Sequence, residues 1–291
     1  MTRFSLVLST VDRTDEVKRF LFSLDFQTHR QFELIVVDQN KDGRLLHILE
    51  PYEKKFSILR CASEPGLSRA RNVGLEYITG DVVTFPDDDG WYPPDLFEKV
   101  ANLLDERPEL DGITVPIEFR TGQGDEPIAV KGRSVGAARW DKQAGPLNKA
   151  NIWVRVCSQG LFLRRSVVEK VGGFDETLGV GSRTLWEAGE DIDYPLRAVE
   201  AGYEIYYRPD MCVFHPTLPR QDYAALADRA YRYGAGIGRV WRKHNYPLWL
   251  VCYYFLRPFG GACLSLALGR MDEARYYLQS LRGRLRGWRS R

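Results

Sequence analysis

The chain has 291 residues, a formal net charge of +2, and apolar and charged fractions of 44% and 27%. These totals fit a globular protein with one large α/β domain, or one domain with an appendage, and they exclude a low-complexity chain. The five cysteines are scattered and odd in number, which favours a reducing compartment and argues against a disulfide framework or a zinc cluster. A strand-like stretch follows Arg3 directly, so we expect no secretory signal peptide.

Charge is distributed unevenly along the chain. Residues 229–291 hold 13 Lys and Arg against 2 acidic residues, whereas the preceding 228 residues hold 28 against 37. The tail is therefore physically distinct from the rest of the chain. Its basic charge suits an anionic membrane surface or nucleic acid.

Strand and helix patterns alternate through the first 110 residues. Strand-length apolar runs are found at 4–10, 32–37, 56–59 and 82–85, and helical patterns at 17–26, 45–52, 66–78 and from Pro93. This alternation predicts an α/β fold whose mostly parallel sheet is flanked by helices. Later segments predict strands at 112–119, 159–163 and 203–207, a helix at 187–201, and an irregular insert at 120–150.

Acidic residues follow three of these strands. Asp12 follows the first strand, Asp38 the second, and Asp87–Asp89 the apolar run at 82–85. In open α/β sheets the ligand lies at the carboxyl ends of the strands, so we expect these side chains to gather at one edge. Three adjacent carboxylates repel one another unless a cation lies between them, and a divalent metal held by Asp87 and Asp89 would serve. The alternative is a solvated acidic turn.

A metal at this edge predicts a nucleotide diphosphate as ligand. The metal would bridge phosphate oxygens while Thr10, Asp12 and Asp38 hydrogen-bond the base and ribose. Arg69 and Arg71 open the neighbouring helix, where a guanidinium can bind anionic oxygens in bidentate fashion. Alternatively, Asp12 and Asp38 only cap the helices that follow them.

A second group of candidates lies about 100 residues later. Glu190 and Asp191 start a helix, where they either complement the helix dipole or supply a general base, with Asp191 in that role. His215 follows a strand and could complete the shell of a divalent metal, although a lone histidine is often structural. Trp186 could stack on an acceptor sugar or simply pack.

The tail predicts three helical segments. A long amphipathic helix starts at Pro219. Residues 247–268 are strongly apolar but interrupted by Arg257-Pro258 and Gly260-Gly261, so we predict a broken in-plane or re-entrant segment whose halves are too short to span a bilayer. The last helix carries an apolar stripe and many arginines, as in an interfacial basic helix, although an ordinary packing helix has the same pattern. The stripe comprises Met271, Ala274, Leu278, Leu281, Leu285 and Trp288.

Six motifs occur in an informative order. They are Phe4–Asp12, Val36–Asp38, Gly66–Gly74, Asp87–Asp89, Gly172–Glu176 and Gly189–Asp193. Over about residues 3–217 this ordered set resembles family 2 glycosyltransferases of the GT-A fold. The tail is similar to that of bacterial members that build polysaccharides or glycolipids.

The resemblance implies a nucleotide-sugar donor, usually UDP-linked, a Mn²⁺ or Mg²⁺ ion, and inversion at the anomeric carbon. By this likeness Thr10, Asp12, Asp38 and Arg71 hold the nucleotide. Asp87 and Asp89 form the Asp-x-Asp metal motif, with Asp88 assigned to the donor, and Asp191 is the base beside Glu190. One departure from the family matters. The family often has an aliphatic residue followed by Asp-x-Asp-Asp, whereas here Pro86 precedes and Gly90 follows the three aspartates, so which two of them bind the metal stays open.

We therefore predict a GT-A catalytic domain at 1–217, with its nucleotide-sugar half at about 1–117 and its acceptor half at about 118–217. Residues 218–291 form a helical extension that associates with the membrane. The predicted activity is inverting, metal-dependent transfer of a sugar to a glycan or lipid-linked acceptor. It would take place at the cytoplasmic face of the cell membrane, in polysaccharide or glycolipid synthesis.

Three other functions are compatible with parts of the sequence. A sugar-phosphate nucleotidyltransferase needs a Gly-rich N-terminal phosphate loop with a lysine, which residues 8–13 lack. A nucleic-acid-binding protein would use the basic tail but has no need of its long apolar segment, so we expect no nucleic acid partner. A non-catalytic protein would bind the sugar nucleotide without turnover.

Overall fold

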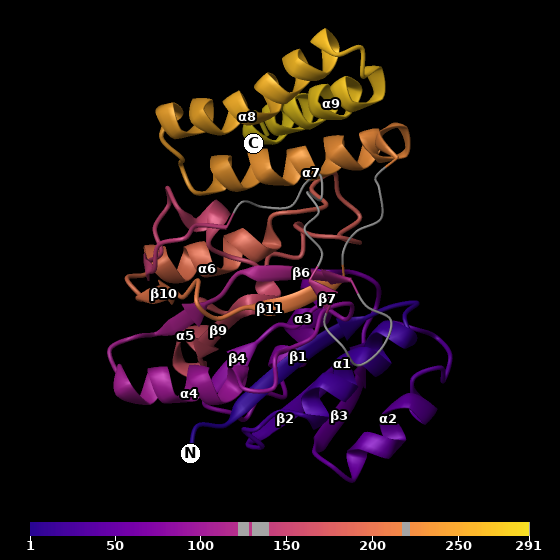
Figure 1. Ribbon diagram of the computed structural model, residues 1–291, viewed down its shortest axis with the longest axis vertical. Coiled ribbons are helices and arrows are strands. Elements are labelled where there is room, and N and C mark those ends of the chain that lie inside the picture. Colours follow the sequence, from indigo (N-terminus) through magenta and orange to yellow (C-terminus); the bar gives the residue numbers. More distant parts are fainter. Residues whose placement is uncertain (122–127, 130–139, 217–221, 291) are drawn as a thin grey trace. The chain divides into compact units, whose positions relative to one another are not determined.

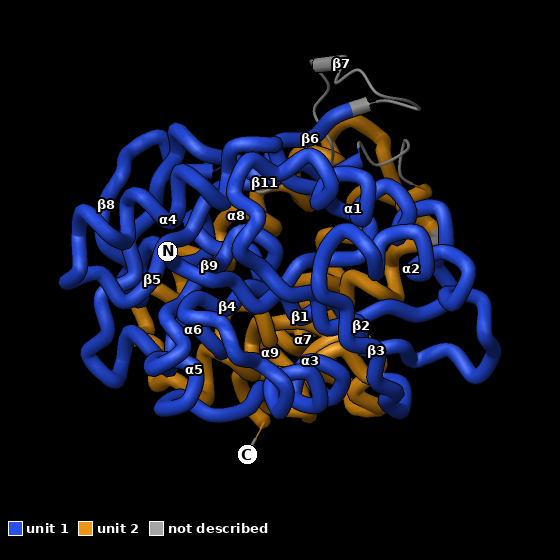
Figure 2. The backbone as a smooth tube through the Cα atoms, turned by 90° about the horizontal axis from the view of Figure 1, so that it is seen from below, with its two compact units in different colours: residues 1–65, 69–174, 194–217 blue, residues 66–68, 175–193, 218–291 orange. Residues whose placement is uncertain are grey.

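The computed structural model describes residues 1–121, 128–129, 140–216 and 222–290. The chain forms two compact units, drawn in different colours in Figure 2. The first unit comprises residues 1–65, 69–174 and 194–217, and the second comprises residues 66–68, 175–193 and 218–291. The second unit thus joins the C-terminal helices to two short segments from the middle of the chain. The division into domains 1–217 and 218–291 stays a prediction.

Among the described residues, an eight-stranded mixed sheet forms the centre of the first unit (Figure 1). Its order is β3 (Ser57–Ala62), β2 (Phe32–Asp38), β1 (Phe4–Thr10), β4 (Val82–Thr84), β9 (Leu161–Arg164), β5 (Gly112–Thr114), β10 (Ile205–Tyr207) and β8 (Gly145–Pro146). The first four strands are parallel, and β9 runs antiparallel between β4 and β5. The predicted α/β fold with a mostly parallel sheet is confirmed.

Helices cover both faces of this sheet, because its central strands are apolar on both sides. α1 (Asp15–Asp25), α2 (Leu46–Glu53) and α4 (Leu96–Glu106) share one apolar cluster with Phe4, Leu6 and Leu8 of β1. α3 (Leu67–Leu75) lies on the opposite face, where Gly74 approaches Val7 and Val37 so closely that a Cβ would collide with them. The remaining elements here are α5 (Arg165–Val171), α6 (Glu190–Glu200), and the 3₁₀ turns Ile152–Val154 and Ser158–Gly160.

A second sheet has the order β11 (Val213–Pro216), β6 (Ile117–Thr121) and β7 (Ile128–Ala129). The single strand predicted at 112–119 is therefore wrong, because β5 and β6 belong to different sheets. Pro116 separates them and has no N–H to donate to a ladder. Most of the predicted insert at 120–150 lies outside the described residues.

The second unit contains the helices α7 (Tyr223–Lys243), α8 (Leu248–Ala267) and α9 (Met271–Trp288). α7 and α9 run parallel and meet backbone to backbone at Gly234, Gly238, Gly283 and Gly287. A Cβ on any of these glycines would fall on a backbone carbonyl oxygen of the facing helix. This contact requires glycine at all four positions. The predicted helix start at Pro219 lies outside the described residues.

α8 is one continuous helix, so the broken segment predicted at 247–268 is wrong. Pro258 lies inside it and cannot donate to the carbonyl of Tyr254 one turn earlier. Arg284 of α9 takes that place, because its Nη1 donates to the Tyr254 carbonyl over 2.6 Å. A neighbouring helix therefore satisfies the acceptor that the proline leaves open. Among the described residues, α8 alone is long and apolar enough to cross a membrane, by length and composition only.

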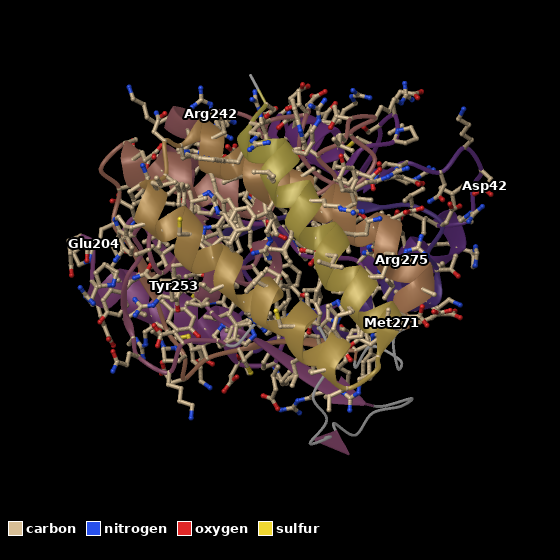
Figure 3. The ribbon with its side chains drawn as sticks, turned by 90° about the horizontal axis from the view of Figure 1, so that it is seen from above. Asp42, Glu204, Arg242, Tyr253, Met271 and Arg275 are labelled. Atoms are coloured by element: carbon tan, nitrogen blue, oxygen red, sulfur yellow. The ribbon has the colours of Figure 1, made fainter. Side chains whose placement is uncertain are left out.

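α9 turns its smallest side chains inward. Ala274, Gly283 and Gly287 are buried, whereas Met271 and Leu278 of the predicted apolar stripe are 64% and 41% exposed. Figure 3 views α8 and α9 from above, with Tyr253, Met271 and Arg275 labelled. The glycine face of α9 makes the packing contact. Met271, Leu278 and Leu285 stay exposed, and Leu281 and Trp288 are partly exposed.

Candidate active site

The acidic strand ends of the first unit meet at one edge of the sheet, as predicted. The register of β1 and β2 places Thr10 opposite Asp38. A parallel bridge on the other side of β1 joins Ser9 to Asp87. The end of β1 therefore lies between Asp38 and the aspartates that follow β4.

Asp38 is 1% exposed and organises the turn after β2. Its Oδ1 accepts hydrogen bonds from the backbone N–H and the Nδ2 of Asn40, each at 2.8 Å. Its Oδ2 accepts from Nε and Nη2 of Arg60, at 3.0 and 2.8 Å. Asp38 does not cap α2, which begins eight residues later at Leu46.

Asp12 lies in an exposed turn with a left-handed backbone, φ 58°. Its N–H donates to Oδ1 of Asn40 over 2.8 Å, and its carboxylate lies 3.1 Å from Nη1 of Arg44. Asn40 thus ties the turn after β1 to the turn after β2. The sequence prediction missed Asn40, Arg44 and Arg60, whose roles depend on how these turns fold.

Arg13 binds two of the three consecutive aspartates. Its Nη1 lies 2.8 Å from Oδ1 of Asp88 and 2.5 Å from Oδ2 of Asp89. Arg19 adds a hydrogen bond of 2.8 Å from Nη2 to the backbone carbonyl of Asp89, and its guanidinium lies over Trp91. Neither arginine was predicted, although Arg13 stands in the polar group that ends the first strand.

Arg71 binds the remaining aspartate from inside the unit. It is 1% exposed, and its Nη2 lies 3.2 Å from Oδ1 of Asp87 and 2.9 Å from Oγ of Ser158. Its Nε and Nη1 have no hydrogen-bond partner within the described ranges, and the guanidinium lies over the rings of Phe85 and Phe174. This geometry orients Asp87. The predicted contact of Arg71 with a nucleotide stays a prediction, as does that of Arg69, a partly exposed residue of α3.

His215 joins the group because β11 pairs with the chain just after the aspartates. Trp91 forms a bridge to Phe214, and this brings Nε2 of His215 to 3.3 Å from Oδ1 of Asp89. Nδ1 of His215 lies 2.9 Å from the carbonyl of Pro216, to which it can only donate. Burial acts to lower the pKa of His215, but Asp89 outweighs burial and raises that pKa, because the protonated ring can donate from Nε2 to this carboxylate.

Gly90 explains the departure from the family pattern. A Cβ there would collide with the side chain of Gln159, whose Nε2 donates to the carbonyl of Phe214 over 3.0 Å. This contact links the aspartate turn to β11. A fourth aspartate at position 90 would break it.

The three carboxyl groups differ in pKa. Burial raises the pKa of Asp88 to about 6, against the opposing effect of Arg13. Burial also raises the pKa of Asp87. Burial acts to raise the pKa of Asp89 as well, but His215 and Arg13 outweigh it and hold that pKa below its ordinary value. Asp89 is therefore the most firmly ionised of the three.

The donor atoms suit a hard divalent cation. Carboxylate oxygens from three consecutive aspartates and one imidazole nitrogen lie at the strand edge, and these are ligand types that Mn²⁺ and Mg²⁺ accept. In the part of the chain that is described, no three such side chains already converge as a ready metal cluster. One oxygen each of Asp88 and Asp89 is instead bound to the guanidinium of Arg13.

The other predicted residues belong to the second unit. Asp191 lies partly exposed in the first turn of α6, next to Glu190, which is buried beside Gly179. The guanidinium carbon of Arg239 lies over the ring of Trp186, 4.5 Å from the ring centroid. The structure describes this group and the aspartates of the first unit separately.

Asp193 fixes this first turn of α6 to the end of α7. It is 1% exposed, and its Oδ1 lies 2.7 Å from Nζ of Lys243 and 2.9 Å from Nε2 of His244. Lys243 also binds Asp175, at 2.7 Å. Backbone packing supports the same attachment, because a Cβ on Gly236 of α7 would fall on the backbone of Ala188. The C-terminal helices therefore hold the segment that carries Asp191.

The family model described as glycosyl transferase family 2 matches residues 5–172. The chain belongs to this family. It is an enzyme of the glycosyltransferase class with a GT-A fold. Among curated relatives, the glycosyltransferase AglE of Haloferax volcanii is 24% identical over 270 residues, which cover 87% of this chain and 82% of the relative.

Solved structures of the same fold cover nearly the whole chain. The mannosyltransferase PcManGT from Pyrobaculum calidifontis, in complex with GDP-Man and Mn²⁺, has a TM-score of 0.64 at 15% identity, over 98% of this chain and 87% of that one. S. aureus TarS 1-349, in complex with UDP-GlcNAc, has a TM-score of 0.60 at 17% identity, over 96% of this chain and 91% of that one. At these identities the likeness shows the fold of this glycosyltransferase.

Proposed function

We propose that this glycosyltransferase moves a sugar, with inversion, from a UDP-linked donor to the hydroxyl of a glycan or lipid-linked acceptor, with Mn²⁺ or Mg²⁺ as cofactor. The observation that carries the proposal is the edge at which Asp87–Asp89 lie beside Thr10 and Asp38. Proteins of similar fold hold UDP-GlcNAc, or GDP-Man with Mn²⁺.

The donor's nucleoside would bind where β1 and β2 end. Asp38 is fixed by Asn40 and Arg60, so its carboxylate is held in one orientation before the ligand arrives. Pre-organisation of this kind lowers the entropic cost of binding. Thr10 and Asp12 border the same edge. Asp88, next to Asp87 in the chain, would contact the donor from the neighbouring turn.

The residues that would hold the metal are Asp89, Asp87 and His215. A bound divalent cation offsets the charge that develops on the departing diphosphate, so no protein acid is needed to protonate it. Asp89 is best suited as a ligand because it stays ionised. Arg71 and Ser158 keep Asp87 turned toward the same edge.

Asp191 would serve as the base. Its carboxylate accepts the proton of the acceptor hydroxyl while the oxygen attacks the anomeric carbon from the face opposite the diphosphate, and this geometry inverts the configuration. Glu190 stands beside it at the helix start. Trp186, held by Arg239, would offer a ring face to the acceptor sugar.

Metal binding by Asp89 can be tested directly. We expect Asp89→Ala to lose metal-dependent UDP binding together with activity, each by at least ~10²-fold. Replacing a residue that only supports a metal ligand already lowers metal affinity or activity by about 10- to 100-fold. Calorimetric titration of UDP with and without Mn²⁺ measures the binding. Asp105→Asn, on α4, is the matched control. Undiminished metal-dependent turnover in Asp89→Ala would contradict the assignment.

We also propose that the C-terminal helices lie on the cytoplasmic face of the cell membrane, where polysaccharides or glycolipids are assembled. Two observations support this placement. The exposed side of α8 carries large apolar residues, and the tail has a surplus of basic charge that suits anionic lipid. The exposed large apolar residues of α8 are Leu248, Trp249, Tyr253, Leu256, Phe259, Leu264 and Leu266.

Point substitutions test this placement better than truncation, because removing α9 would strip α7 of its packing partner. We expect the double change Trp249→Ser and Leu256→Ser to weaken sedimentation with phosphatidylglycerol-containing vesicles at least ~10-fold, since each buried side chain contributes about 1.5–3 kcal/mol. The control is Phe26→Ser with Leu46→Ser, two exposed apolar residues of the first unit. Equal sedimentation of both variants would overturn the proposal.

A further inference from the structure

We propose that Arg13 couples metal binding to donor binding. In this inference Arg13 holds Asp88 and Asp89 until a divalent cation takes their oxygens, and its guanidinium then passes to the diphosphate of the donor. The inference rests on the proposed metal-dependent function. It gives Arg13 a role beyond the proposed function, and it predicts that the metal displaces Arg13 from the aspartates before the diphosphate binds it.

The first step is competition for the same oxygens. Nη1 of Arg13 lies 2.8 Å from Asp88 Oδ1 and 2.5 Å from Asp89 Oδ2. A guanidinium and a divalent cation repel each other strongly at separations near 4 Å in a partly buried site. A cation that takes these same two oxygens, Oδ1 of Asp88 and Oδ2 of Asp89, therefore displaces Arg13 from them.

The second step concerns the carboxylate oxygens that remain. Oδ1 of Asp89 faces His215 at 3.3 Å, and Oδ1 of Asp87 faces Arg71 and Ser158 at 3.2 and 3.4 Å. These three partners lie deeper than Arg13, whose side chain is 39% exposed, against 16% for His215 and 1% for Arg71. Of the groups that hold the three aspartates, Arg13 is therefore the one with room to move.

The third step is the new partner for the freed guanidinium. Arg13 follows Asp12 in the turn after β1, at the sheet edge where the donor's phosphates are expected. Its fork of donors matches phosphate oxygens in bidentate fashion. The diphosphate thus replaces the carboxylates of Asp88 and Asp89 as the anionic partner of Arg13. By thermodynamic linkage, bound metal then raises the affinity for the nucleotide, and bound nucleotide raises the affinity for the metal.

Mn²⁺ binding measured by electron paramagnetic resonance of the free ion tests this without any turnover. For Arg13→Gln and Arg13→Ala we expect Mn²⁺ affinity without nucleotide to rise at least ~10-fold, because the competing cation is gone. With Mn²⁺ present, UDP affinity should fall at least ~10-fold, because the diphosphate loses a charged partner. Arg107→Ala, whose side chain is 37% exposed and bound to Glu109, is the matched control and should change neither.

The outcomes distinguish a failure of the Arg13 proposal from a failure of the proposed metal site. If the Arg13 variants keep the thermal midpoint of the parent but bind Mn²⁺ with unchanged affinity, the role of Arg13 is overturned while the metal site stands. If UDP affinity is unchanged, the transfer of Arg13 to the diphosphate is overturned. If neither the parent nor the variants bind Mn²⁺ with or without UDP, the metal site and the inference fall together.

Discussion

The variant Asp191→Asn should bind donor normally and lose at least ~10²-fold in the rate of sugar transfer, because an amide cannot accept the proton of the acceptor hydroxyl. Asp191 is partly exposed in the first turn of α6, whereas Asp193, two residues later, is buried against Lys243 and His244. The carboxylate of Asp191 is thus partly accessible to a substrate, whereas that of Asp193 binds Lys243 and His244.

Single-turnover measurements with the enzyme in excess over the donor, at saturating acceptor, report the chemical step, and titration with UDP and Mn²⁺ reports donor binding. Glu200→Gln, at the exposed end of the same helix, is the control for a charge lost from α6. Normal turnover in Asp191→Asn would remove Asp191 from the mechanism. If Glu190→Gln then lost the rate instead, with its fold intact, the base would be Glu190.

The second large effect concerns stability. Gly283→Ala should destabilise the second unit by about 1–3 kcal/mol or more, because its Cβ would fall on the carbonyl of Tyr231 and force α7 and α9 apart. Gly260→Ala in α8 is the matched control. No atom lies within 4 Å of a Cβ at that position, so alanine should be neutral or stabilise the helix by ~0.5–1 kcal/mol.

Thermal unfolding followed by circular dichroism compares the two variants with the parent. A lower midpoint for Gly283→Ala and an unchanged or higher one for Gly260→Ala are expected. A midpoint for Gly283→Ala at or above that of the parent would show that α7 and α9 do not pack as described. Because α7 also holds the segment around Asp191 through Lys243, activity should fall together with the midpoint.

Local patterning was enough to predict the first four strands of the sheet and its acidic edge, but not the separation of β5 from β6 or the edge strand β8. Apolar runs marked β1, β2 and β4, and the rule that ligands lie at the carboxyl ends of parallel strands placed Asp38 and Asp87–Asp89 together. His215 was predicted from its place behind a strand, and the pairing of Trp91 with Phe214 is what brings it to Asp89.

What sequence reasoning missed depends on contacts between distant segments. Arg13, Asn40 and Arg60 are ordinary polar residues until the turns after β1 and β2 fold against each other. The break in α8 was predicted from Pro258, but Arg284, 26 residues later, supplies the hydrogen bond that the proline cannot. The attachment of residues 175–193 to the C-terminal helices likewise rests on Gly236, Lys243 and His244, which carry no local signal.

The most direct test of the central claim is a panel of nucleotide sugars and their nucleoside diphosphates, scored by thermal stabilisation with and without Mn²⁺. The account predicts that a UDP-linked sugar raises the midpoint of the parent only when the metal is present, and that Asp89→Ala loses the shift. Equal stabilisation with and without metal, or a shift kept in full by Asp89→Ala, would contradict it.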